Sequence, residues 1–182
     1  MATEIEGRIL NINEIEITKK LAKSGAKQLG NYNFRRYVFN TIPKVPNRWV
    51  RLRTNGEKTT LAVKEISEKR GLDSTSEWEV EVSDFDTTYK LLKKIGLKPK
   101  GYQENRRAEY SLNGATVSID TWPILGTHLE IEAKSELQVH KCAETLGFSA
   151  KDIVDTDVDN LYKKIGINLE KISKLTFESG AE

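Results

Sequence analysis

"HLEIEAKSELQVHKCAETLG", residues 128–147, changes its periodicity once, and that change indicates the fold. Its first residues alternate between apolar and polar side chains, which is typical of a strand with one buried face. Ser135 is a residue type that caps helices, and after it the apolar residues recur at helical spacing until Gly147, a residue type that ends them. The stretch therefore predicts a strand with two glutamates on one face, followed at once by a helix over 136–147.

The same arrangement occurs two more times in the chain. Each copy has glutamates at alternate positions of a strand, then a capping residue, then a helix that ends at a glycine 12 positions after the cap. The glutamate pairs are Glu4 with Glu6, Glu79 with Glu81, and Glu130 with Glu132, and the helices are expected over 14–25, 85–96 and 136–147, after the caps Asn13, Asp84 and Ser135. We interpret this as one strand–helix unit used three times, by duplication or by convergence on one geometry.

Alternation with a period of two extends the prediction to about eight strands. They are expected over roughly 3–12, 31–42, 47–54, 58–66, 76–83, 101–112, 114–121 and 127–134. Asn-Gly pairs at 55–56 and 113–114 predict tight hairpin turns, so most neighbouring strands are expected to be antiparallel. The polar segment 67–75 is expected to be a loop.

The C-terminal part of the chain has a different pattern. From about residue 149, apolar residues form one stripe at helical spacing. The stripe consists of Leu161, Ile165, Leu169, Ile172 and Leu175. We therefore expect a main domain over 1–147 and a helical extension over 148–182 that packs on the same domain, over one end or side of the sheet.

Charged residues recur on one face of almost every predicted strand. Glutamates are paired on three strands, whereas arginine or lysine occupies four others, at Arg36, at Arg51 with Arg53, at Lys64 and at Arg107. On any single strand a solvated face is the more common explanation. The grouping of Arg and Glu by strand instead favours an α+β fold in which an eight-stranded antiparallel closed β-barrel turns its charged faces into one lumen, with helices packed outside.

The composition of the predicted lumen favours one kind of chemistry. Buried charges are costly unless they are paired or bind ions. Clustered carboxylates without His or Cys at ligand spacing favour Mg²⁺ or Mn²⁺ over zinc. Arg and Lys opposite them favour a phosphate-rich anion. Because cations that bridge carboxylates to phosphates commonly organise phosphoryl or nucleotidyl transfer, the lumen is a candidate site for that chemistry.

The rest of the sequence argues against several other classes. It contains no GxxxxGK[ST], GxGxxG, GxSxG or CxxC motif. With 29 Lys and Arg against 27 Asp and Glu, the chain is nearly neutral, and nucleic acid is not an expected partner. A single cysteine and the lack of a long apolar stretch predict a cytoplasmic protein with no disulfide framework and no membrane partner. His128 and His140 are interpreted as surface residues, and Cys142 as a small core residue.

In their order and spacing, these motifs resemble the CYTH, or triphosphate tunnel metalloenzyme, superfamily, which includes class IV adenylate cyclases, thiamine triphosphatases and inorganic triphosphatases. The shared elements are an N-terminal ExEx[K/R], an "RLR" strand, a strand that ends in Lys, a middle "ExE", and the run "IDTWPILGTHLEIEAKSE" at 119–136. The resemblance covers roughly residues 3–147. It implies an eight-stranded antiparallel tunnel that binds a triphosphate together with Mg²⁺ or Mn²⁺.

The resemblance also implies roles for individual residues. Metal binding is expected at Glu4, Glu6, Asp120, Glu130 and Glu132. Phosphate binding is expected at Arg8, Arg36, Arg51, Arg53, Lys64 and Arg107. Catalytic roles are expected for Arg8, Glu79 and Glu81, of which the two glutamates would orient the basic residues or an attacking water.

Arg8 is a departure from the family pattern, which most often has Lys at this position. Arginine keeps the positive charge, but it does not give up a proton and it is bulkier. The expected function is metal-dependent hydrolysis of inorganic triphosphate, thiamine triphosphate or a nucleoside triphosphate, so the expected partner is a small molecule that carries a triphosphate. Two alternatives stay open: a class IV adenylate cyclase that forms cyclic AMP, and a non-catalytic module that binds polyphosphate or a nucleotide. A homodimer also stays open.

Overall fold

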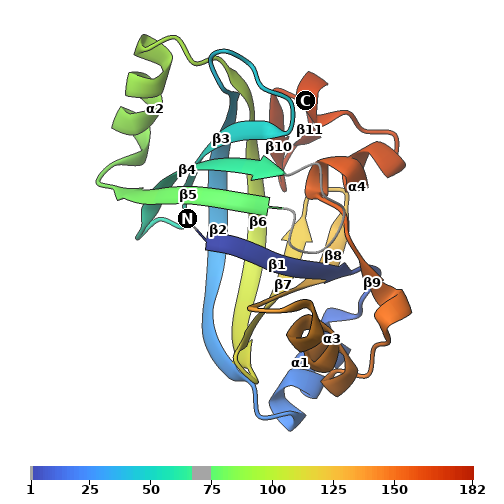
Figure 1. Cartoon of the computed structure of the whole chain (residues 1–182). Coiled ribbons are helices and arrows are strands. Elements are labelled where there is room, and N and C mark those ends of the chain that lie inside the picture. The colour runs from blue at the N-terminus through green and yellow to red at the C-terminus, as the bar shows by residue number, and fades with distance from the viewer. Residues whose placement is uncertain (1, 67–74) are drawn as a thin grey trace.

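The computed structural model of the chain describes residues 2–66 and 75–182, with side chains from residue 5 onward within those ranges. All eight predicted strands are present (Figure 1). They are β1 (Ala2–Ile9), β2 (Lys27–Asn40), β3 (Arg48–Thr54), β4 (Thr59–Ile66), β5 (Thr75–Val82), β6 (Pro99–Leu112), β7 (Ala115–Trp122) and β8 (Gly126–Ala133). Apart from Thr75, the predicted loop over 67–75 lies outside the described residues.

The eight strands form one large antiparallel sheet that curls back on itself. Their order is β6-β2-β3-β4-β5-β1-β8-β7, and β7 pairs in addition with β6. The prediction of a fully closed barrel is nevertheless too strong, because the short strand β1 divides its length between two neighbours. It pairs with β5 only over Ala2–Glu4, and with β8 over Ile5–Ile9. Trp78–Val82 of β5 therefore pair with β4 alone among the described strands, and the wall is incomplete there.

The three predicted strand–helix units are confirmed. The helices are α1 (Glu14–Lys23), α2 (Phe85–Lys94) and α3 (Glu136–Thr145), each two residues shorter at its end than predicted. The caps Asn13, Asp84 and Ser135 each accept a hydrogen bond from a backbone N–H in the first turn. After each helix, a glycine adopts the left-handed conformation that ends it, at Gly25, Gly96 and Gly147.

The helices cover the outer face of the sheet and leave its inner face to the charged residues. Leu21 of α1 and Val139 of α3 belong to one core with Leu129 and Ile131 of β8. Phe85 of α2 belongs to a second core with residues of β2 and β3. Figure 1 shows α1 and α3 together, and α2 at the opposite end of the molecule. Because side chains alternate between the faces of a strand, the outward apolar residues fix the charged residues of the same strands on the inside.

The C-terminal extension is not the helical segment that its apolar stripe predicted. It comprises short 3-10 turns at Ala150–Asp152 and Leu169–Lys171, the helix α4 (Val158–Lys164), and the strands β9 (Ile153–Val154), β10 (Lys174–Thr176) and β11 (Gly180–Ala181). Gly166, with a φ of 82°, follows α4 and ends the helical run. The stripe residues Leu161, Leu169 and Leu175 are buried all the same, since β9 pairs with β1 and β10 with β6. None of the helices in the described ranges has the length and apolar run that crossing a bilayer requires.

Candidate functional site

The inner face of the sheet surrounds a cavity of about 780 Å³. Its walls come from strands far apart in the sequence, because alternate residues of each strand point to the same side. The predicted site residues that line it are Glu6, Arg8, Arg36, Arg51, Arg53, Lys64, Glu79, Arg107, Asp120, Glu130 and Glu132. The structure thus brings most of the predicted charges into one enclosed space.

Two predicted residues are not placed in this cavity. Glu81 pairs instead with Lys58 at 2.9 Å, and both side chains are more than half exposed. It therefore gains no support as a catalytic residue from its position. The side chain of Glu4 lies outside the described residues, so its role as a metal ligand stays a prediction.

One side of the cavity carries a cluster of guanidinium groups. Arg36 of β2 and Arg53 of β3 are cross-strand partners, and Arg51 lies two positions further along β3. The Arg36 side chain donates a hydrogen bond to Asn105 and stacks over the Trp122 ring, 4.6 Å from its centroid. Among the described residues it has no carboxylate partner within salt-bridge distance.

This cluster is electrostatically strained. Burial and the positive charges of Arg53 and Arg51 hold the pKa of Arg36 well below its usual range. Burial, together with Arg51 and Arg107, lowers the pKa of Arg53 to about 10. Because both shifts reflect like charges in a poorly hydrated space, an anion bound here would be stabilised.

Glu77 is a cavity residue that sequence reasoning missed. It is buried and accepts a hydrogen bond from Arg51 at 2.6 Å, and its other oxygen lies 2.9 Å from the Lys64 ammonium. Glu79 accepts a second bond from Arg51 at 3.0 Å and lies 3.8 Å from Arg53. The stretch "SEWEVEV" holds three glutamates at alternate positions, and the prediction took only the last two. Extending the alternation by one step would have found Glu77.

The opposite side of the cavity is acidic. Glu6 and Glu132 are cross-strand partners on β1 and β8, and Arg8 faces Glu130 in the same register. Burial and the negative charges of Glu130 and Glu6 raise the pKa of Glu132. Burial would also raise the pKa of Glu130, but Arg8 and Arg107 outweigh it and hold that pKa below its usual range.

Arg107 ties the acidic side together. It donates to both oxygens of Asp120, at 3.0 and 2.5 Å, and to Glu130 at 2.9 Å. Asn105 donates a further hydrogen bond to Asp120 at 2.8 Å. Asp120 and Glu130 are therefore held by guanidinium and amide donors.

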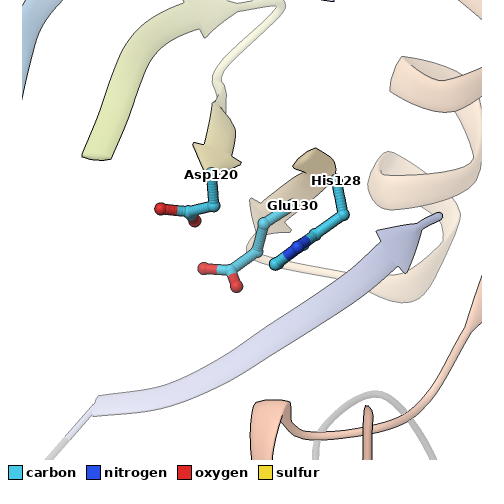
Figure 2. Close-up of side chains that lie close together, drawn as sticks. All are labelled: Asp120, His128 and Glu130. Atoms are coloured by element: carbon cyan, nitrogen blue, oxygen red, sulfur yellow. The ribbon is translucent and has the colours of Figure 1, made fainter. Parts of the chain in front are cut away.

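His128 lies in this acidic region, and its interpretation as a surface residue is wrong. Figure 2 shows its ring, from β8, beside Glu130 and near Asp120, and one ligand atom from each of the three residues lies within 4.8 Å of the others. The side chain is 2% exposed, and neither ring nitrogen has a hydrogen-bond partner among the described residues. Burial lowers its pKa. Its position, two residues before Glu130 on the same strand, was the signal that it faces inward.

The carboxylates fit a hard divalent cation such as Mg²⁺ or Mn²⁺. The donors are mainly oxygen atoms, as these ions prefer. Within the part of the chain that the structure describes, the Glu132 side chain makes no hydrogen bond or ion pair, and its neighbour Glu6 has one oxygen without a partner. A cation at this pair would relieve the repulsion that raises the pKa of Glu132.

Comparison with known proteins agrees with this geometry. A family model described as the CYTH domain matches residues 2–155. A solved structure from Pyrococcus horikoshii OT3 is 26% identical, with a TM-score of 0.75, over 87% of this chain and 98% of that chain. A conserved hypothetical protein from Pyrococcus furiosus is 22% identical, with a TM-score of 0.75, over 87% of this chain and 99% of that chain.

A third similar structure comes from Hippeastrum, where the protein is described as an adenylyl cyclase candidate with a dominant triphosphatase activity. It is 16% identical, with a TM-score of 0.61, over 92% of this chain and 98% of that chain. At that identity the likeness concerns the fold. No curated protein matches the chain.

Proposed function

The chain belongs to the CYTH family, and on that basis we propose that it hydrolyses a triphosphate in its charged cavity with the help of Mg²⁺ or Mn²⁺. The observation that carries the proposal is the division of one 780 Å³ cavity into a guanidinium side and a carboxylate side. The first side suits the phosphate oxygens and the second suits a cation that bridges to them. The incompletely closed sheet is then the wall of the triphosphate tunnel that the family resemblance implied.

The guanidinium side is proposed to hold the phosphate chain. Arg36 and Arg53 have lowered pKa values and would gain most from a polyanion. Arg51 and Lys64 share Glu77, which fixes their positions at the edge of this cluster. Glu79 contacts both arginines of β3 and is proposed to orient them, which is one of the roles predicted for it.

The carboxylate side is proposed to hold the divalent cation. Glu6 and Glu132 are the residues with carboxylate oxygens left to bind it, and Glu130 and Asp120 complete the acidic surroundings. When bound, the ion would polarise a phosphoryl oxygen and lower the pKa of a water molecule. Arg107, held by Asp120 and Glu130, lies between the ion site and the phosphate site and is proposed to bind the phosphate nearest the ion.

Arg8 supports a second candidate, the non-catalytic module. Its guanidinium is held by Glu6 and Glu130, so it is not poised to move a proton, and a binding protein would need no such step. The two candidates differ in turnover and agree in binding.

Products separate these functions. The full chain is incubated with inorganic triphosphate, thiamine triphosphate or ATP, each with Mg²⁺ or Mn²⁺, and the products are resolved. Release of orthophosphate supports hydrolysis, pyrophosphate with cyclic AMP identifies the cyclase, and tight binding without products identifies the module. If no triphosphate binds, and Arg53→Gln behaves like the unsubstituted chain, the proposal is wrong. Arg48→Gln is the matched control, because Arg48 lies outside the cavity and pairs with Glu65.

A further inference from the structure

Arg8 is held on three sides by oxygen atoms of the acidic region. Its Nη2 donates to Glu6 Oε1 and to Glu130 Oε2, both at 2.8 Å, and its Nη1 donates to the backbone carbonyl of Thr156 at 2.5 Å. The residue is buried, and the two carboxylates raise its pKa in spite of that burial. A positive charge fixed between two carboxylates lies where a metal ion would otherwise be expected.

The acceptor oxygens show what is left for a metal. Both oxygens of Glu130 accept from guanidinium groups, one from Arg8 and one from Arg107. Both oxygens of Asp120 are also engaged, by Arg107 and Asn105. Within the described residues, the cavity carboxylates of this side that keep an oxygen without a donor are Glu6 and Glu132, which face each other across β1 and β8.

The charges lead to the same division. The acidic side has four carboxylates, at Glu6, Asp120, Glu130 and Glu132, and two guanidinium groups pair with them, from Arg8 and Arg107. Two negative charges remain, which is the charge that one divalent ion balances. A second divalent ion would have to compete with two charge-assisted guanidinium contacts in a desolvated site.

We propose that Arg8 is a resident cation that takes the place of a second metal ion, so that the cavity binds a single Mg²⁺ or Mn²⁺, at Glu6 and Glu132. This rests on the proposed function, and it assigns Arg8 a role in neutralising the acidic side that differs from the phosphate-binding role predicted from the sequence. Thr156 fixes the guanidinium from the C-terminal segment, so the chain itself supplies this charge at any metal concentration.

The test counts Mn²⁺ ions on the full chain without triphosphate. Mn²⁺ is titrated into the protein, and the free ion is measured by its electron paramagnetic resonance signal. The unsubstituted chain is expected to bind one ion. Glu132→Gln is expected to weaken that binding by at least about tenfold, because it removes a ligand. Arg8→Gln is expected to bind two ions, because it returns one negative charge and releases an oxygen on each of Glu6 and Glu130.

The controls keep this test decisive. Arg48→Gln removes an arginine outside the cavity and should still bind one ion, which excludes a general effect of net charge. Two ions on the unsubstituted chain, or one ion on a folded Arg8→Gln chain, would overturn the proposal. If Arg8→Gln does not fold, the count on the unsubstituted chain and its response to Glu132→Gln decide alone.

Triphosphate hydrolysis, measured in parallel, separates this proposal from the proposed function. Two bound ions together with hydrolysis refute the role of Arg8 and leave the function standing. No Mn²⁺ binding overturns the role of Arg8 and the metal dependence together. One bound ion without any triphosphate binding supports the role of Arg8 and refutes the function.

Discussion

Arg53 lies among charges of its own sign, with Arg51 and Arg107 near it and only a distant contact to Glu79. Burial and these neighbours lower its pKa to about 10, which means that the folded protein disfavours its charged form. A side chain that costs stability in the free protein and contacts the proposed ligand is typical of a binding site. The cost is offset when an anion binds.

We therefore expect Arg53→Gln to separate stability from binding. The melting temperature without ligand should stay the same or rise, because a strained charge is removed. Affinity for inorganic triphosphate should fall roughly ten- to hundred-fold, the equivalent of about 1.5–3 kcal/mol for a charged hydrogen bond. Calorimetry measures both quantities. A loss of stability equal to that of a core substitution would show that Arg53 is a structural residue.

Cys142 gives a prediction at high pH. The thiol is 1% exposed, and burial raises its pKa to about 11, against about 8.5 for a free cysteine. Since the folded state favours the protonated thiol, its contribution to stability is complete below pH 8.5 and is lost as the pH rises towards 11. At pH 8 the native protein should react slowly with a disulfide reagent, and the denatured chain should release one equivalent at once. Rapid reaction of the native protein would contradict the buried position.

Individual site residues were predictable where the alternation of a strand was unambiguous. Arg51 and Arg53, two positions apart on a strand with apolar residues between them, line the cavity as predicted. Glu77 and His128 were missed because each lies at the end of an alternating run, where the sequence gives no contrast between faces. The partners of Arg8 were beyond prediction, since they depend on contacts between residues 122 and 148 positions apart.

At the level of elements, the three helices were predictable because each carries its own start and stop signals. The short 3-10 turns and strands after residue 149 were not, because their pairing with β1 and β6 decides their conformation more than their apolar stripe does. The same holds for the incomplete wall beside β5. Its cause is how β1 is shared between two neighbours, which no local pattern encodes.

The helix caps allow a direct test at this scale. Asn13 accepts a hydrogen bond from the Glu16 N–H at the start of α1, which packs on the outer core behind the acidic strands. Asn13→Ala should lower the free energy of unfolding by about 1 kcal/mol, and Asn13→Asp should preserve it, because aspartate is an equally good cap. Urea denaturation measures the difference. Equal losses in both variants would show that the side-chain hydrogen bond does not contribute.

At the scale of the whole molecule, the C-terminal segment is connected to both sides of the cavity. On the acidic side, the Thr156 carbonyl accepts from Arg8, next to the pairing of β9 with β1. On the guanidinium side, Tyr162 of α4 packs against Trp122, whose ring lies under Arg36. The segment therefore fixes one arginine on each side, although the residues that it contributes lie outside the repeated strand–helix units.

Tyr162 is where this connection can be tested. Its hydroxyl donates to the Pro123 carbonyl at 2.5 Å, and its side chain is fully buried with its ring edge-on to Trp122. Tyr162→Phe removes one hydrogen bond and should cost about 1 kcal/mol of stability, with triphosphate affinity preserved because the ring still supports Trp122. Tyr162→Ala also removes the packing, so it should cost about 3–5 kcal/mol and leave Trp122 and Arg36 without support. At a temperature where both variants are folded, calorimetry with inorganic triphosphate should then show weaker binding only for the alanine variant. Unchanged affinity in that variant would mean that the cavity holds Arg36 without help from the C-terminal segment.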